Sequence, residues 1–453
     1  MKHRLVISVI LLTLAAVSIS SAHFGAQYEP PDGNTYHGVG WQIQAQNAYC
    51  GMFPDSLQPL LHQSMHALPG YMRRGGMTVA GLLRGLAPDN FDAETQYPEI
   101  SVHFGLEGEA ADDVFANSDR YDNYIDTLAT ALGEYGRPVF LRIGGEMNGR
   151  WNGYHPYDFP RAFRKLVEGI RDIGVDNFAS IWCYEPDAGS DFADSNRAGW
   201  KWYPGDDVVD WFGIDLFDAD HFDPDEPDSA ETRNGWEITK KGRTELFMRF
   251  ADERGKPVYI NELSARHVWI TPYDDEVDST NGEVDWDFWF APFFEFLDNH
   301  PGVKAFNYIN LDWTQYDQWE RWGDARLQIN EYIRDQWVEA LSSERYIHSG
   351  YDIAQHASAP GETSAVPDEY DMVVYPNPFN STLSVRFSLE HPSNVIISIF
   401  DINGRRMTDL ANRRFSTGSH QIGRDVGKLS TGIYLIRMTT PEKSQTIKAA
   451  HIK

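Results

Sequence analysis

The chain has 453 residues, carries a formal net charge of −28 at pH 7 and contains 14 tryptophans. This length is greater than that of a usual single domain, and the negative charge argues against a nucleic-acid partner. The two cysteines, Cys50 and Cys183, exclude a disulfide framework, although one bridge between them stays open.

The first 22 residues have the composition of a secretory signal peptide. A basic start from Lys2 to Arg4 precedes a mainly apolar run from Leu5 to Val17, and Ser20–Ala22 supplies the small residues of a cleavage site. We expect cleavage before His23. The apolar run is too short for a membrane-spanning helix, and no cysteine follows the cleavage site to carry a lipid. No later segment is long and apolar enough to span a membrane.

Short apolar runs that alternate with helical patterns follow the signal. Strands are predicted at Tyr36–Trp41, loosely at Met77–Leu82, and at Glu99–Phe104. The apolar residues from Tyr121 to Leu132 recur at the spacing of a helix, which Gly136 ends.

The strands of the second half are better defined. A helix with one apolar face is predicted from Phe159 to Ile170. Strands are predicted at Phe140–Glu146, Phe178–Tyr184, Val208–Phe217, Pro257–Glu262 and Val303–Trp313. Eight strands that alternate with helices predict an α/β fold, in which a closed (β/α)8 TIM barrel is favoured over an open sheet.

Two of these strands end in a glutamate. Glu146 and Glu262 both follow apolar runs, and the carboxyl ends of barrel strands are where such a fold keeps its chemistry. Each glutamate could instead cap a loop or form a surface ion pair. Asp215 and Asp218, near the end of another strand, are rival partners for Glu146.

The residues before Glu146 follow the alternation of a strand. Inward positions alternate, so Arg142, Gly144 and Glu146 are predicted to share one side of the strand. Arg142 would then lie deeper in the barrel, where its charge could hold a carboxylate ionised.

The segment Arg142–Trp151 resembles the acid/base motif of glycoside hydrolase family 26, the β-mannanase family of clan A. Three further segments fall in that family's order: Asn177–Pro186, Tyr203–Asp215 and Lys256–Glu262. The resemblance covers roughly residues 35 to 340. It implies a (β/α)8 barrel with Glu146 as acid/base on the fourth strand and Glu262 as nucleophile on the seventh.

Two positions depart from the family pattern. Gly145 stands where the family usually has histidine before the acid/base, and Phe217 stands where it usually has a tyrosine that touches the nucleophile. Both departures remove hydrogen-bonding groups near the reacting sugar. We expect Gly145 to widen the site around the acid/base.

Aromatic residues near strand ends are the candidates for binding sugar, because the flat C–H faces of sugars stack on aromatic rings. Trp313, Trp182 and Trp151 are the first candidates, although packing is the alternative for each. The complete substrate-binding set is Arg142, Asn148, Trp151, Trp182, Phe217, Trp313 and His103, and His155 is a weaker candidate. No metal site and no cofactor are expected.

The composition changes beyond about Ser343. Residues 348–371 contain Ser, Gly, Ala and Pro without periodicity, and predict a linker after a glycosidase domain of residues 23–347. Short runs at Leu383–Phe387, Val395–Phe400 and Gly432–Met438 are separated by turn residues, and predict a small, Ig-like β-sandwich over residues 372–453.

This second module resembles the C-terminal sorting domain of type IX secretion cargo. The matching segments are Tyr375–Asn380, Phe400–Arg405 and Leu429–Leu435. The resemblance implies export across the outer membrane, followed by release or attachment to the cell surface. The secretion machinery is therefore an expected partner.

The sequence as a whole predicts a secreted retaining glycoside hydrolase of a neutral polysaccharide. The first expectation is an endo-β-mannanase that cleaves β-1,4-mannan by a two-glutamate double displacement. Other neutral β-glycans, such as glucan or xylan, are the second. A non-catalytic surface glycan-binding protein on a degenerate barrel is the third.

Overall fold

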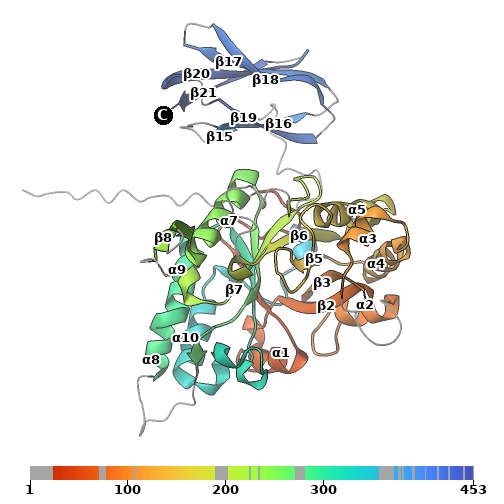
Figure 1. The fold of residues 1–453 in the computed structure, drawn as a ribbon, viewed down its shortest axis with the longest axis vertical. Coiled ribbons are helices and arrows are strands. Elements are labelled where there is room, and N and C mark those ends of the chain that lie inside the picture. Colours follow the sequence, from red (N-terminus) through yellow and green to blue (C-terminus); the bar gives the residue numbers. More distant parts are fainter. Residues whose placement is uncertain are drawn as a thin grey trace, which may run out of the picture. The chain divides into compact units, whose positions relative to one another are not determined.

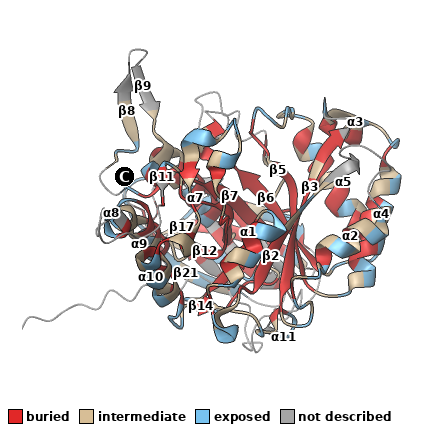
Figure 2. Cartoon of the chain, turned by 90° about the horizontal axis from the view of Figure 1, so that it is seen from below, coloured by how far each residue is buried: buried red, intermediate tan, exposed pale blue. Residues whose placement is uncertain are grey.

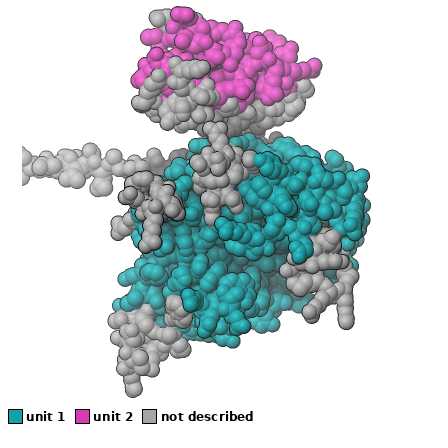
Figure 3. All heavy atoms as spheres, in the orientation of Figure 1, with its two compact units in different colours: residues 1–357 teal, residues 358–453 magenta. Residues whose placement is uncertain are grey.

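The structure is a computed structural model with two compact units, residues 1–357 and 358–453, which Figure 3 colours separately. In the first unit it describes residues 24–70, 78–106, 109–188, 202–223, 226–232, 235–270 and 281–356. In the second it describes residues 372–375, 379, 382–389, 393–402, 405–415, 418–426, 429–441 and 444–451. The predicted signal peptide, residues 1–22, lies outside the described residues.

Eight parallel strands form a closed barrel in the first unit, which confirms the predicted fold class (Figure 1). Each strand pairs with the next, and the last pairs with the first through Tyr36–Ala305 to Val39–Tyr308. The barrel strands are β1 (Thr35–Val39), β2 (Leu61–Gly70), β3 (Tyr97–Leu106), β5 (Val139–Glu146), β6 (Phe178–Tyr184), β7 (Trp211–Leu216), β10 (Val258–Leu263) and β12 (Val303–Tyr308).

Helices surround the barrel, and their exposed residues lie on their outer faces (Figure 2). They are α1 (Ile43–Cys50), α2 (Val79–Leu86), α3 (Asp112–Asn117), α4 (Asp122–Tyr135), α5 (Phe159–Asp172), α7 (Lys240–Arg254), α8 (Asn281–Asp285), α9 (Ala291–Asn299), α10 (Glu331–Leu341) and α11 (Ile353–His356). Short extra strands are β4 (Glu109–Ala110), β8 (Ser229–Thr232), β9 (Gly235–Ile238), β11 (Val268–Trp269), β13 (Gly323–Asp324) and β14 (Tyr346–Ile347). No helix among the described residues is long and apolar enough to cross a membrane.

Helix α5 shows why the sequence pattern identifies these helices. Pro160 occupies its first turn, where the absent N–H costs no hydrogen bond. Phe163, Leu166 and Ile170 then recur on one face and are completely buried against the barrel. Gly136 ends the preceding helix, α4, in a left-handed conformation with φ of 67°.

Two predicted strand positions are wrong. The second barrel strand is Leu61–Gly70, whereas residues 79–82 belong to helix α2. The last barrel strand ends at Tyr308, and Trp313 begins a 3-10 turn, η5 (Trp313–Gln315), beyond it. Strand β2 lacks the apolar run that predicts a buried strand, because it carries polar residues, among them Gln63, that form hydrogen bonds inside the barrel.

The predicted linker also begins too early. Residues 349–356 remain with the barrel: Ser349 N donates to Gln58 O over 2.9 Å and Gly350 N to Thr95 O over 2.9 Å. Ile353 is completely buried, and its backbone N–H donates to the hydroxyl of Tyr97 over 3.2 Å. The remaining part of the predicted linker, residues 357–371, lies outside the described residues.

The second unit consists of two antiparallel sheets. One has the order β15-β16-β19 and the other β18-β17-β20-β21, and both supply residues to one apolar core, as in a β-sandwich. The strands are β15 (Val373–Tyr375), β16 (Thr382–Leu389), β17 (Ser393–Asp401), β18 (Arg406–Phe415), β19 (Gly418–Asp425), β20 (Gly432–Thr439) and β21 (Ser444–His451).

Candidate active site

Strand β5 is irregular immediately before Glu146. Gly144 and Gly145 both adopt positive φ, 84° and 59°, and the pairing with β6 shifts between Arg142 and Glu146. A Cβ at Gly144 would lie 2.2 Å from the ring of Phe159 in α5, so this position faces outward. The prediction that Gly144 shares the inward side is therefore wrong, because a bulge interrupts the alternation.

Arg142 lies inside the barrel with no exposed surface and contacts two carboxylates. Its Nη1 donates to Glu262 Oε1 over 2.5 Å, and its Nη2 donates to Asp215. Asp215 Oδ1 in turn accepts the backbone N–H of Glu262 over 3.0 Å. Glu262 is therefore held through its side chain and its backbone, with a cation beside its carboxylate.

Glu146 ends the fourth barrel strand, and Glu262 is the penultimate residue of the seventh. The indole Nε1 of Trp151 donates to the Glu146 carboxyl group, and Asn152 Nδ2 donates to its backbone carbonyl over 2.7 Å. Burial, and after it the negative charge of Glu262, raise the pKa of Glu146 to about 7, against the lowering effects of Arg142 and of the hydrogen bond from Trp151. The two glutamates thus occupy opposite electrostatic environments, one beside a cation and one favouring its proton.

A third acidic residue, Glu185, belongs to the site, although it is not among the site residues predicted from the sequence. It follows β6 directly and is 2% exposed. Carboxyl oxygens of Glu146, Glu185 and Asp215 all lie within 4.8 Å of one another. Such a trio has the donor chemistry of a cation site, yet Asp215 already has Arg142 and Glu146 already has Trp151 as partners. The available signal was position, since Glu185 follows a barrel strand as closely as the two predicted glutamates end theirs.

Asn148, predicted to bind substrate, holds the backbone of Glu185 in place. Its Nδ2 donates to Glu185 O over 2.8 Å, and its Oδ1 accepts Glu185 N–H over 3.0 Å. Since Asn148 lies two residues after Glu146, these bonds join the ends of β5 and β6.

His103 occupies the space beside Gly145. A Cβ at Gly145 would lie 2.4 Å from His103 Cε1, so the ring takes the place of a side chain there. The expectation that Gly145 widens the site is therefore wrong. Burial and the charge of Arg142 lower the pKa of His103 to about 4, so the ring is neutral at pH 7.

Aromatic residues gather beyond the ends of β1, β7 and β12. Trp313 is 2% exposed, and its ring centroid lies 5.7 Å from that of Trp41 and 5.0 Å from that of Trp322. Phe217 packs on the same cluster, with its centroid 4.9 Å from Trp322. In contrast, Trp151 is 62% exposed beside Glu146.

Trp182 does not face the site. It is completely buried, with its ring 5.7 Å from Phe247 of α7, and its Nε1 donates to Trp202 O over 3.0 Å. The expectation that Trp182 binds sugar is wrong, because the ring packs between the strand and the helix that covers it.

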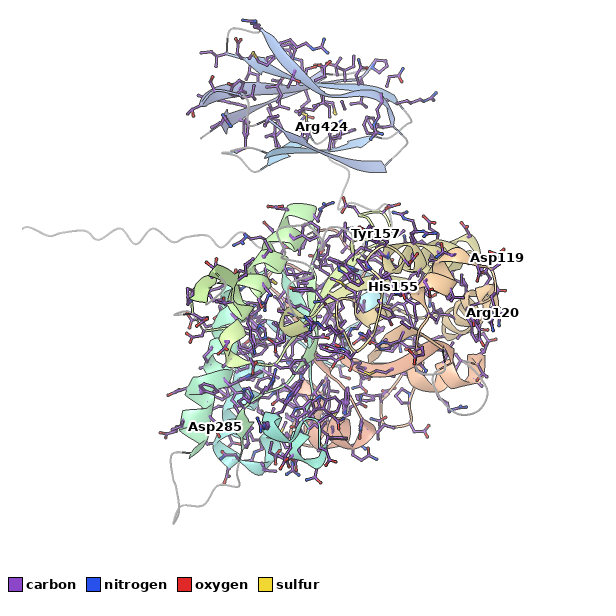
Figure 4. All side chains as sticks on the ribbon, viewed as in Figure 1. Asp119, Arg120, His155, Tyr157, Asp285 and Arg424 are labelled. Atoms are coloured by element: carbon purple, nitrogen blue, oxygen red, sulfur yellow. The ribbon has the colours of Figure 1, made fainter. Side chains whose placement is uncertain are left out.

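Two other acidic or basic candidates are engaged elsewhere. Asp218 pairs with Lys240, Arg266 and His267 and makes no ion pair with Arg142. His155, labelled in Figure 4, lies on the loop between β5 and α5 and contacts Asp112 over 3.4 Å. Both cysteines are free thiols, and the sulfur of Cys183 lies 3.5 Å from Asp215 Oδ1.

Each of the two units contains residues that match a known protein family. Residues 107–286 match glycosyl hydrolase family 26, and residues 373–453 match the secretion system C-terminal sorting domain. A β-1,3-xylanase from a Vibrio species is 33% identical over 330 residues, which are 65% of this chain and 66% of that protein. A β-1,3-xylanase from an Alcaligenes species is 34% identical over 253 residues, 52% of this chain and 49% of that protein.

A mannan endo-1,4-β-mannosidase from Bifidobacterium adolescentis is also similar. It is 28% identical over 131 residues, which are 28% of this chain and 12% of that protein. The chain thus spans 66% and 49% of the length of the two xylanases, and a much smaller share of the mannosidase.

Proposed function

We propose that the chain is a secreted retaining hydrolase of β-1,3-linked xylan, made of a glycoside hydrolase family 26 domain and a C-terminal secretion sorting domain. The observation that carries the reaction class is the pair Glu146 and Glu262 at the ends of the fourth and seventh barrel strands. The pair supplies one carboxyl group that favours its proton and one that lies against Arg142.

The first step forms a covalent glycosyl-enzyme. Glu262 attacks the anomeric carbon, and the bond from that carbon to the glycosidic oxygen breaks as Glu146 protonates this oxygen. Two contacts fix the orientation of the attacking carboxylate: Arg142 donates to the Glu262 side chain, and Asp215 accepts the backbone N–H of Glu262. In the second step Glu146, now ionised, removes a proton from water, whose oxygen displaces Glu262 from the anomeric carbon.

The substrate assignment rests on the relatives. Two β-1,3-xylanases share 33% and 34% identity with this chain over 330 and 253 residues. β-1,4-Mannan is the second candidate, because the β-mannosidase shares 28% identity over 131 residues. The acidic barrel favours a neutral polysaccharide in either case, since residues 23–371 contain 62 acidic and 26 basic side chains.

The sorting domain indicates a secreted or cell-surface protein. The secretion machinery is the partner that we propose for it. Residues 372–453 carry 11 basic and 5 acidic side chains, a charge opposite to that of the rest of the chain.

The test is release of reducing sugar from β-1,3-xylan, β-1,4-xylan, β-1,4-mannan and mixed-linkage β-glucan under one set of conditions. We expect the highest rate on β-1,3-xylan, and β-anomeric ends in the first products seen by proton NMR. A higher rate on mannan would support the second candidate. Binding of a polysaccharide without hydrolysis would instead support a glycan-binding protein on a degenerate barrel.

A further inference from the structure

Glu185 is a buried acid that the mechanism above does not use. Its carboxyl group lies in the same cluster as those of Glu146 and Asp215, within 4.8 Å, and the residue is 2% exposed. Its position is fixed on both sides. Asn148 bonds its backbone N–H and carbonyl, and the backbone N–H of Asp187 donates to its Oε1 over 2.6 Å.

The charges around Glu185 disfavour its ionised form. Burial is the largest cause of its raised pKa, and the acidic groups that raise the pKa further are Glu146 of β5, Asp187 of the turn after β6, and Asp215 of β7. The nearby cations have other partners: Arg142 bonds Asp215 and Glu262, Lys240 pairs with Asp187 and Asp218, and Arg243 donates to Pro186 O. No basic side chain of the described residues forms an ion pair with Glu185, and burial raises its pKa well above the ordinary value.

We propose that Glu185 is a positioning residue for the acid/base, which keeps its own proton and donates that O–H to the Glu146 carboxyl group. The proposal rests on the proposed function, because it assigns Glu185 a part in the cycle of Glu146. A carboxylate buried among other acids is costly unless a donor faces it, and a neutral carboxylic acid is such a donor.

The cycle shows when this donor matters most. Glu146 loses its proton to the glycosidic oxygen and must then hold a negative charge until water supplies another proton. The O–H of Glu185 stabilises that charge together with the indole N–H of Trp151. Glu185 itself neither gains nor loses a proton. Asn148, two residues after Glu146, bonds the backbone of Glu185 and so holds the two glutamates near each other.

Two variants separate this role from a structural one. Glu185→Gln keeps a neutral donor, so we expect kcat within about threefold of the wild type and an unchanged alkaline limb of the pH profile. Glu185→Ala removes the donor, so we expect kcat to fall about tenfold or more and the alkaline limb to move to higher pH, because ionised Glu146 is less well stabilised. A shift to lower pH in Glu185→Ala would overturn the proposal, since it would mean that Glu185 had been negatively charged. Unchanged profiles in both variants would also overturn it.

A measurement that needs no turnover tests the same proton. Infrared spectra of the wild type and Glu185→Gln at pH 7 should differ by one protonated carboxyl band, which the Gln variant lacks. Absence of that difference overturns the proposal even if the wild type hydrolyses every polysaccharide offered. If the band is present and no polysaccharide is cleaved, the proposed function fails while the protonated state of Glu185 stands.

Discussion

Arg142 Nη1 lies 2.5 Å from Glu262 Oε1, and the two residues are 120 positions apart in the chain. The same guanidinium donates to Asp215, which also accepts the backbone N–H of Glu262. The two N–H groups of the Arg142 guanidinium therefore orient the Glu262 carboxylate, and its positive charge favours the ionised form of that carboxylate.

Replacing Arg142 should cost both stability and activity. Arg142→Ala leaves buried carboxylates unpaired, for which we expect a loss of about 3–5 kcal/mol in the free energy of unfolding. Arg142→Lys keeps the charge but not the fork, and should fall between this variant and the wild type in unfolding temperature and in turnover. Arg164→Ala is the control, because that partly exposed arginine pairs with Glu168 and Asp207 at the surface, where pairs contribute about 0–1 kcal/mol. Equal unfolding temperatures for Arg142→Ala and Arg164→Ala would contradict the role of Arg142.

The pH profile should report the proton on Glu146. Because the pKa of Glu146 is about 7 and the acid form is needed for the first step, kcat/KM should fall as pH rises through about 7. Trp151→Phe removes the indole N–H that stabilises the ionised form, so the pKa of Glu146 should rise and the alkaline limb should move to higher pH.

Trp319→Phe serves as the control, since Trp319 belongs to the tryptophan cluster around Trp313 and has no contact with Glu146 among those described. If the alkaline limb of the pH profile moved by a similar amount in both variants, the hydrogen bond from Trp151 would not be what sets the pKa of Glu146.

Gly145 should tolerate no side chain while His103 is present. Gly145→Ala adds the strain of φ +59° and a 2.4 Å contact with the His103 ring. Gly174→Ala is the matched control, because Gly174 has φ +90° and nothing within 4 Å of an added Cβ. We expect roughly 1–2 kcal/mol of destabilisation for the control and more for Gly145→Ala. In the double variant with His103→Ala, denaturant unfolding should show that the part of the stability loss caused by this contact is regained. No recovery would show that backbone strain alone accounts for the loss.

The sequence was sufficient for the barrel and for the two proposed catalytic glutamates, since each lies in a local motif. Strand β5 and helix α5 have the apolar spacing that burial requires, and Glu146 is the last residue of the strand. The contacts of Arg142 could not be predicted in this way. Its partner Asp215 is 73 residues away, and only closure of the barrel brings them together.

The wrong predictions also concern features that depend on how distant segments pack together. Trp182 alternates with residues that face the barrel interior, and the sequence did not show on which side its ring would pack. The bulge at Gly144 and Gly145 depends on φ values that glycine permits but does not require. The position of Glu185 directly after β6 is visible in the sequence, but its neighbours are not, because they come from β5 and β7.

Contacts of residues 349–353 with the barrel define the C-terminal end of the first unit. A chain that ends after residue 357 should keep the unfolding temperature of the first unit and the activity of the full protein. A chain that ends at residue 348 loses Ile353, whose burial contributes about 2 kcal/mol, and the backbone bonds of Ser349 and Gly350. It should unfold at a lower temperature in calorimetry. Equal temperatures for the two chains would show that residues 349–357 do not stabilise the barrel, and loss of cooperative unfolding in both would show that the sorting domain is part of its fold.

The last prediction concerns the separate roles of the two glutamates. Glu262→Ala lacks the nucleophile and should abolish turnover of polysaccharide and of activated aryl glycosides alike. Glu146→Ala lacks only the proton donor, so an aryl glycoside with a good leaving group should still form the glycosyl-enzyme, while polysaccharide is not cleaved.

Azide then distinguishes the two faces of the sugar. In Glu146→Ala, azide can enter from the side that the acid/base vacates and displace Glu262, which gives a β-glycosyl azide with retained configuration. In Glu262→Ala, azide can enter from the opposite face and give the α product, since no covalent intermediate forms. Proton NMR of the products identifies the anomer. Because Asp215 already has Arg142 and the backbone of Glu262 as partners, it should not replace either glutamate, and Asp215→Asn should give neither azide product. Full activity of either alanine variant on polysaccharide would exclude the assignment and return attention to Asp215.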